Sequence, residues 1–452
     1  MLDTLQSLRQ TAADAHRAGR LDAALAAYAR YLAQSPGDAA IWSNLGVLHR
    51  TAGRHMMALR AHDRALALDP DGIGTMNNAA NVLSDVGRYD DSLQLRERVL
   101  RRTPDDRAQL AMVVRCLRGK GHYAAAIVRA KAALVRFPDD AELRMQLAFA
   151  QLAAGDYAAG LENYKARWRA GELQPRHLPF PEWHGESLND RTIAVLPEQG
   201  FGDAVLFARF LSVLRQWRCR VVMPVKAPLR RLLHDLPELD EMVETLRPDM
   251  EIDYWVNMMD LAALHFAKGG AVPAPAPLTV PADSVARARA LTAPYRDRFR
   301  IGVVWTGSVT YRGNAFRSFS HRDLLPLTDL PGVQLFSLYK GPELTAYHAD
   351  GSDAFIIDTG SSERDFADTA AMMRACDLVI TSDTATAHIA GSLGVPVWVV
   401  LHWDAFWVYT HHGTATPWYP GMRLFRQHRP LDWDGVMGDV AAALRHRQES
   451  AA

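Results

Sequence analysis

The sequence predicts an α-helical repeat array followed by two α/β lobes, each built on a parallel sheet of the Rossmann type. Glycine and proline recur with a fixed period of 34 residues over the first third of the chain. Beyond residue 190, short apolar runs alternate with helical patterns, as in βαβ units. The proline-rich stretch 271–281 divides these runs into two sets. We therefore expect two lobes with a cleft at the carboxyl ends of their strands.

Composition narrows the classes of function. The 452 residues include 51 Lys and Arg and 51 Asp and Glu, and this balance argues against nucleic acid as the partner. The three cysteines are far apart and lack metal-ligand spacing, as in proteins of a reducing compartment. The N-terminus has no apolar signal core, and no run of about 18 apolar residues occurs. We expect a cytoplasmic protein that does not insert into a membrane.

The period of 34 residues is kept by two residue types. Glycine stands at 19, 53, 87, 121 and 155, and proline at 36, 70, 104 and 138. The copy at 39–72 carries Trp42 and Gly46 in its first helix, while His49 and His62 occupy positions that are usually aromatic. This pattern resembles the tetratricopeptide repeats. About five copies fill residues 1–172, which we expect to form a solenoid of paired helices.

The concave groove of such a solenoid is lined by the first helix of each pair. Asn44, Asn78 and Gln146 share one groove-facing position of the repeat, with Gln10 and Met112 at the same position in the other copies. A side-chain amide both donates to and accepts from a peptide backbone, so this row suits the capture of an extended polypeptide. A similar asparagine ladder lines the repeats of the protein O-linked N-acetylglucosamine transferases. The alternative is that these amides are ordinary polar residues on an exposed helix face.

The remainder of the chain divides into four further segments. We expect a connector over 173–190, a first lobe over 191–280, a second lobe over 281–432, and a C-terminal helix in 433–452 that crosses back to the first lobe. Strands are expected at 192–196, 219–225, 252–258, 299–305, 333–339, 354–358, 377–381 and 395–401. Two such lobes joined by a proline-rich link form a GT-B-like arrangement.

Two loops at the predicted strand ends carry the candidate chemistry. The first, EQGFGD, places Gly200 and Gly202 at a tight turn and Asp203 at the start of a helix. Asp203 is either a helix-capping carboxylate or a general base that takes a proton from an attacking hydroxyl.

The second loop, SDTATAH, leads from a strand into a helix. The first-turn N–H groups of this helix, with the hydroxyls of Thr384 and Thr386, are suited to holding a phosphate. The alternatives are that Ser382 or Asp383 caps the helix and that His388 is a packed helical residue.

Several segments together resemble the heptosyltransferase-like, family nine glycosyltransferases. They are EQGFGDAVLFARF, IGVVWTGSVTYRGNAFRS, FSLYKG and DTAAMMRACDLVITSDTATAHIAGSLGVPVWVVL. The order of repeats and lobes resembles bacterial tetratricopeptide-repeat glycosyltransferases, some of which modify flagellins. The sequence departs from the family at Ala385, where glycine is usual, and at Arg317, where lysine is frequent. Arginine keeps the positive charge and can hold a diphosphate through two donors.

The resemblance implies an enzyme that transfers a sugar, with inversion, from a nucleotide-sugar to a hydroxyl of a protein such as flagellin. Asp203 matches the position of the proposed catalytic base. The implied donor-binding residues are Gly202, Arg317, Lys340, Ser382, Asp383, Thr384 and His388. The resemblance implies no cofactor and no metal ion.

Two questions stay open on sequence alone. The aromatic segment 402–427 suits stacking on a sugar or base, metal ligation, or packing of a long loop against the lobes. The whole chain also fits a non-catalytic repeat scaffold with degenerate lobes. Transfer to a lipid-linked glycan is a narrower alternative within the enzymes.

Overall fold

A computed structural model describes residues 5–171, 173–311 and 313–450 of the chain. The predicted end of the repeat array, residue 172, lies outside these ranges. The chain divides into two compact units, residues 1–150 and 151–452, which we treat separately.

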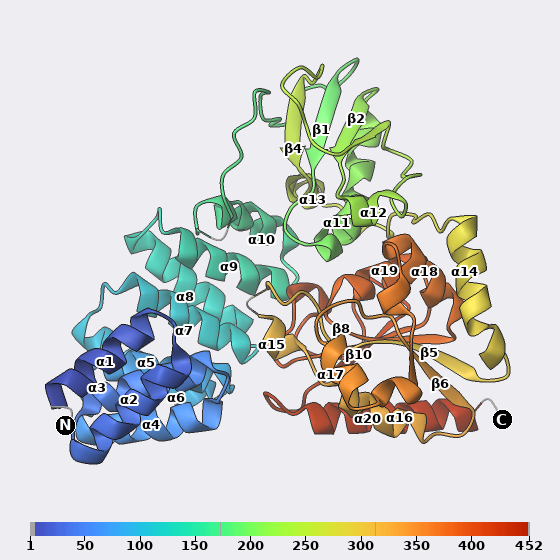
Figure 1. The fold of residues 1–452 in the computed structure, drawn as a ribbon. Helices are drawn as coiled ribbons and strands as arrows, with labels where there is room; N and C mark the ends of the chain where they lie inside the picture. Colours follow the sequence, from blue (N-terminus) through green and yellow to red (C-terminus); the bar gives the residue numbers. More distant parts are fainter. Residues whose placement is uncertain (1–4, 172, 312, 451–452) are drawn as a thin grey trace. The chain divides into compact units, whose positions relative to one another are not determined.

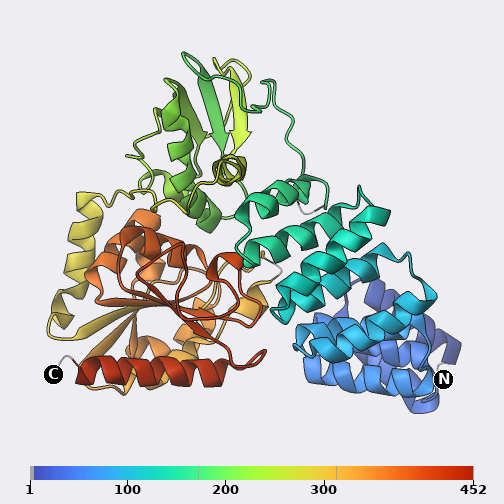
Figure 2. The same ribbon diagram turned by 180° about the vertical axis from the view of Figure 1, so that it is seen from behind.

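The first unit is a stack of paired helices (Figures 1 and 2). The turns within the pairs are made by Gly19, Gly53, Gly87 and Gly121, whose φ angles lie between 67° and 73°. This left-handed conformation is accessible to glycine without strain, which explains the 34-residue glycine period. The helices are α1 (Leu5–Arg17), α2 (Leu21–Gln34), α3 (Ala39–Thr51), α4 (His55–Leu68), α5 (Ile73–Asp85), α6 (Tyr89–Arg102), α7 (Arg107–Gly119), α8 (Tyr123–Arg136) and α9 (Ala141–Ala153).

Small residues let the paired helices approach closely. Ala58 and Ala126, at the same repeat position, are fully buried. His62 fills an aromatic position: it is 1% exposed, and its ring lies so close to Gly46 that a β-carbon there would clash. Burial, assisted by the charge of Arg50, lowers the pKa of His62 to about 4. A neutral imidazole therefore replaces the usual aromatic ring in this core.

The second unit continues the helical pattern with α10 (Tyr157–Tyr164) and the short 3-10 helix η1 (Lys165–Trp168), and then forms two parallel sheets. The first sheet has the order β3-β2-β1-β4. Its strands are β1 (Thr192–Leu196), β2 (Arg220–Pro224), β3 (Glu241–Val243) and β4 (Tyr254–Asn257), joined by α11 (Phe201–Phe207), η2 (Ala208–Gln216), α12 (Ala227–Arg230) and α13 (Met258–Ala267). The short edge strand β3 was not predicted.

The second sheet has the order β10-β9-β8-β5-β6-β7. Its strands are β5 (Phe299–Val304), β6 (Val333–Ser337), β7 (Ile356–Asp358), β8 (Leu378–Ser382), β9 (Val397–Leu401) and β10 (Met422–Arg426). The accompanying helices are α14 (Ala282–Thr292), α15 (Asn314–Arg317), α16 (Leu325–Thr328), α17 (Leu344–Ala349), α18 (Phe366–Ala375), α19 (Ala385–Leu393) and α20 (Trp433–Glu449). Figures 1 and 2 show α18 and α19 on one face of this sheet and α16 and α20 on the other. Parallel strands covered by helices on both faces explain the nearly continuous apolar runs.

The C-terminal helix differs from the expectation. It was predicted to cross back to the first lobe, but α20 packs beside β10 and its Trp433 contacts Phe319, both in the second lobe. The apolar face that includes Val436, Val440 and Leu444 is buried there, which fixes the helix on its own sheet.

The aromatic segment 402–427 is also not one long loop. It contains β10, and Trp407, Trp418 and Tyr419 are 6%, 1% and 1% exposed. Trp418 packs against Phe210 of the first lobe and Tyr157 of α10. Of the three interpretations, packing describes these three rings best, because each ring is buried against neighbouring elements.

Candidate functional site

The loops that follow β1 and β8 meet at Gly202. A β-carbon on Gly202 would lie 3.0 Å from Cδ2 of His388 and 3.2 Å from Cα of Ala385. Gly202 is therefore required for the close approach of α11 to α19 rather than for a left-handed turn. The residue of this loop with a positive φ is Gln199, at 50°, which sequence reasoning missed.

Asp203 lies in the first turn of α11 and is partly buried. Its Oδ2 accepts a hydrogen bond of 2.9 Å from the backbone N–H of Gly200, so the carboxylate does cap the helix, from inside the first turn. Burial raises the pKa of Asp203 to about 6; the Gly200 bond opposes this rise, and the charge of Asp383 adds to it. The carboxyl group therefore titrates just below neutral pH, which suits a general base.

Asp383 and Thr384 lie where β8 passes into α19, and both are nearly buried, at 7% and 8% exposed. Burial raises the pKa of Asp383, and the positive charge of Arg317 opposes that rise. Thr384 is the residue before α19, and its hydroxyl lies 2.6 Å from that of Thr386. The Thr386 hydroxyl in turn contacts that of Thr381. Because the two hydroxyls already bond each other, the first-turn N–H groups remain as the main anion donors of α19.

Arg317 ends α15 and reaches toward this loop. A β-carbon on Gly307 would lie 2.7 Å from Nη2 of Arg317 and 2.8 Å from Cγ2 of Thr384, so one small residue separates the guanidinium from the loop. Nε donates to Oδ1 of Asn314 at 3.2 Å, and the group stacks on Tyr311 with 4.6 Å to the ring centroid. These contacts fix the direction of the guanidinium.

His388, Ser382 and Lys340 differ from the predicted donor contacts. His388 is 4% exposed, stacks on Tyr409 and backs Gly202, and burial lowers its pKa to about 3. Ser382 is fully buried, and its hydroxyl has no hydrogen-bond partner. Lys340 follows β6, and its ammonium donates to the backbone carbonyl of Glu363. Ser382 therefore presents no surface to a donor and His388 almost none, and Lys340 lies one strand further from β8 than Arg317 does.

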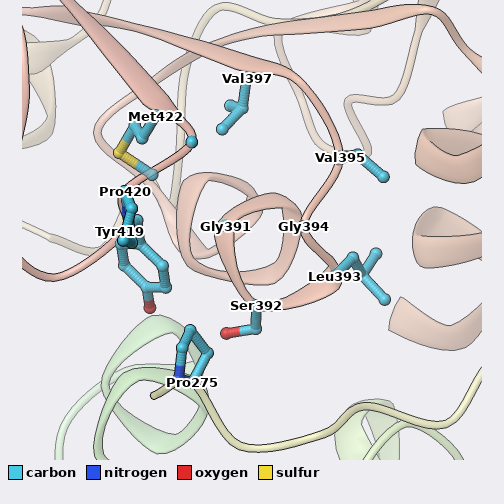
Figure 3. A pocket seen from close by; sticks show the side chains of 11 residues that line it. Pro275, Gly391, Ser392, Leu393, Gly394, Val395, Val397, Tyr419, Pro420 and Met422 are labelled. Atoms are coloured by element: carbon cyan, nitrogen blue, oxygen red, sulfur yellow. The ribbon is translucent and has the colours of Figure 1, made fainter. Parts of the chain in front are cut away.

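Two of the cavities lined by described residues lie beside α15 and α19. One, of about 590 Å³, borders α15 and is lined by residues that include Trp305, Asn314, Ser318 and Glu343. The other, of about 310 Å³, surrounds the C-terminal end of α19, where Ser392, Tyr419 and Pro275 converge (Figure 3). Only the first cavity is adjacent to the helix of Arg317; the second lies at the end of α19 opposite Thr384.

The predicted amide row of the repeats is only partly open. Nδ2 of Asn78 donates to Oγ of Ser43 at 3.0 Å, and both Asn78 and Asn44 are half-buried. Gln146 is 7% exposed and donates to Glu142, so it is not displayed in a groove as predicted. Gln10 on α1 is exposed and donates to Asp14, and Asn44 and Asn78 are the half-buried members of the row.

Within residues 5–171, 173–311 and 313–450, no group of three His, Cys, Asp or Glu side chains is arranged to hold a metal ion. Among the same residues, no helix combines the length and the apolar character needed to span a bilayer.

Comparison with known proteins identifies the repeats. Tetratricopeptide-repeat family models match residues 11–73 and 75–108, so the first unit contains tetratricopeptide repeats, a protein-interaction module. Protein FlbA of Caulobacter vibrioides is 28% identical over 318 residues, which cover 63% of this chain and 52% of FlbA. The chain thus spans about half the length of this curated relative.

Two solved structures contain segments similar to part of the chain. A tetratricopeptide repeat protein from Parabacteroides merdae is 18% identical, with a TM-score of 0.34, over 36% of this chain and 66% of its own. MamA from Desulfovibrio magneticus RS-1 is 18% identical, with a TM-score of 0.35, over 39% of this chain and 99% of its own.

Proposed function

We propose that the chain is a glycosyltransferase of GT-B type that moves a sugar from a nucleotide-sugar to a hydroxyl of a protein recruited by its repeats. The observation that carries the proposal is the meeting of two strand-end loops from separate parallel sheets. Asp203 is on one loop, and Asp383, Thr384 and the start of α19 are on the other, with Arg317 beside them. Transfer from a nucleotide donor requires a base for the acceptor hydroxyl next to a site that holds the donor phosphate. The Asp203 carboxylate and the start of α19 are suited to these two roles.

In the proposed reaction, Asp203 takes the proton of the acceptor hydroxyl. The hydroxyl oxygen forms a bond to the anomeric carbon as the bond from that carbon to the phosphate oxygen breaks, and the electron pair leaves with the nucleotide. Arg317 and the first-turn N–H groups of α19 meet the charge that grows on the departing phosphate. The cavity of about 590 Å³ beside α15 is large enough for a nucleoside.

The acceptor is proposed to be a protein because the first unit contains tetratricopeptide repeats. Flagellin is the first acceptor to test, since the order of repeats and lobes resembles flagellin-modifying enzymes. The resemblance calls for no metal ion, and Arg317 with the start of α19 supplies the positive field that a metal would otherwise give.

The proposal is tested with UDP-, GDP-, ADP- and CMP-sugars that carry a labelled sugar. The full chain is incubated with each donor and with protein from cells whose own copy of the gene is deleted, with purified flagellin from the same cells in parallel. Label in protein from one donor class supports the proposal. Absence of label from every donor, together with no nucleotide binding by calorimetry, would leave the non-catalytic scaffold as the better account.

A further inference from the structure

The loop that carries Asp203 contains a backbone conformation that needs support. Gln199 lies between β1 and α11 with a φ of 50°, in the left-handed region that a residue with a β-carbon rarely adopts. Such conformations persist when surrounding contacts hold them, and they are frequent at functional sites.

The support for Gln199 comes from α10. Nε2 of Gln199 donates a hydrogen bond of 2.7 Å to the hydroxyl of Tyr164, the last residue of that helix. Tyr164 is 8% exposed, so this bond is shielded from water. A side chain more than thirty positions earlier in the sequence thus fixes the turn before Asp203.

The neighbouring residue Glu198 is held by η1, the 3-10 helix that directly follows α10. Its carboxylate accepts hydrogen bonds of 2.7 and 3.0 Å from Nε and Nη2 of Arg167, on η1, and one of 3.2 Å from the backbone N–H of Met259. Arg167 is 2% and Glu198 5% exposed, and Arg167 also donates to Asp260 at 3.0 Å. A buried two-point pair of this kind permits one orientation of the loop.

We propose that Tyr164 and Arg167 are positioning residues that hold the turn at Glu198 and Gln199 so that the loop presents Asp203 to the acceptor. The inference rests on the proposed function, because it assumes that Asp203 is the base. It assigns a role to the end of the helical array that goes beyond recruitment: the helix α10 shapes the loop on which transfer depends.

Variants of the full-length chain separate positioning from mere packing. Tyr164→Phe removes the hydroxyl and keeps the ring, and we expect kcat for transfer to fall about tenfold while the affinity for the nucleotide is unchanged. Tyr157→Phe is the matched control, since it also removes a hydroxyl from α10. The Tyr157 hydroxyl accepts a hydrogen bond of 3.2 Å from Nε1 of Trp418 and does not contact the loop. This variant should retain kcat within about twofold.

Gln199 gives a second, sharper comparison. Gln199→Ala loses the tether and keeps the strain of a positive φ, whereas Gln199→Gly loses the tether and relieves the strain. We expect the Ala variant to be slower than the Gly variant. A Gly variant as slow as the Ala variant would show that the strained conformation of residue 199 does not affect transfer.

Hydrogen exchange supplies a readout that does not need transfer. In Tyr164→Phe the amides of residues 199–205 should exchange faster than in the wild type, and in Tyr157→Phe they should not. Unchanged exchange and unchanged kcat in Tyr164→Phe, with an active wild type, would overturn the inference alone. A wild type without transfer activity would overturn the proposed function, and the exchange result would still decide whether α10 holds the loop.

Discussion

Gly202 and His388 lie on α11 and α19, helices that follow strands of different sheets, yet a methyl group on Gly202 would lie 3.0 Å from Cδ2 of His388. This contact brings the first turn of α11 against the first turns of α19. It places a carboxylate with a raised pKa beside the helix start proposed to hold the donor phosphate.

Gly202→Ala tests this contact directly. The added β-carbon would lie 3.2 Å from Cα of Ala385, and backbone cannot move aside as a flexible side chain does. We expect the two loops to separate and the transfer rate to fall at least tenfold, with a small loss of thermal stability. Gly438→Ala is the control, because a β-carbon on this exposed glycine of α20 would meet no atom within 4 Å. Equal activity of both variants would contradict the role given to Gly202.

The pKa of Asp203 predicts how stability depends on pH. Folding raises this pKa from 3.8 to about 6, so between these values the native state binds more proton than the unfolded state, and Asp203 makes stability fall as pH rises. Asp203→Asn removes this effect and keeps an oxygen that accepts from Gly200. The gain in Tm of Asp203→Asn over the wild type should be near zero below pH 3.8 and should reach a plateau once the pH is above about 7. A gain that shrinks as pH rises would show that the pKa is not raised.

Arg317 and Lys340 are expected to differ in donor binding. The Arg317 guanidinium lies beside Thr384, whereas the Lys340 ammonium already donates to the Glu363 carbonyl. Arg317→Ala should weaken binding of the donor nucleotide at least tenfold by calorimetry, and Lys340→Ala less than threefold. A larger effect at Lys340 would move the phosphate site toward β6.

The repeat amides predict a change in acceptor binding alone. Asn44→Ala and Asn78→Ala should each raise the KM for the acceptor protein about fivefold and leave the affinity for nucleotide unchanged, since one lost hydrogen bond is worth about 1 kcal/mol. Gln146→Ala is the comparison variant, because Gln146 is 7% exposed. It should lower thermal stability without raising this KM. A KM for the acceptor protein that is unchanged in all three variants would argue against an amide row that holds peptide.

Much of the fold was predictable because periodic patterns in the sequence indicate its helices and strands. The 34-residue glycine period marks left-handed turns, and the apolar runs mark buried parallel strands such as β1 and β8. The strands β3 and β10 were missed for a physical reason. β3 is a half-buried edge strand of only three residues, too short to give a clear apolar run. β10 lies in the aromatic segment 402–427, whose aromatic residues pack between elements and mask the pattern of a strand.

The candidate site was only partly predictable. The motif residues Asp203, Asp383 and Thr384 converge because they follow strands of parallel sheets, which sequence order can indicate. Other features of the site depend on side-chain packing between segments that are distant in sequence. These features are the burial of Ser382 and His388, the distance of Lys340 from β8, and the ion pair of Arg167 with Glu198. No local pattern encodes those contacts.

The most direct test of the central claim is the rate of labelled-sugar transfer to protein by the wild type and by Asp203→Asn, under saturating donor. Asp323→Asn is the matched control, because Asp323 caps η4 (His321–Leu324) through the same contact, accepting from the N–H of Ser320 at 2.7 Å. The account predicts that Asp203→Asn retains nucleotide binding and loses transfer by about 10² to 10⁴-fold, while Asp323→Asn remains active. Transfer by Asp203→Asn at the wild-type rate would contradict it.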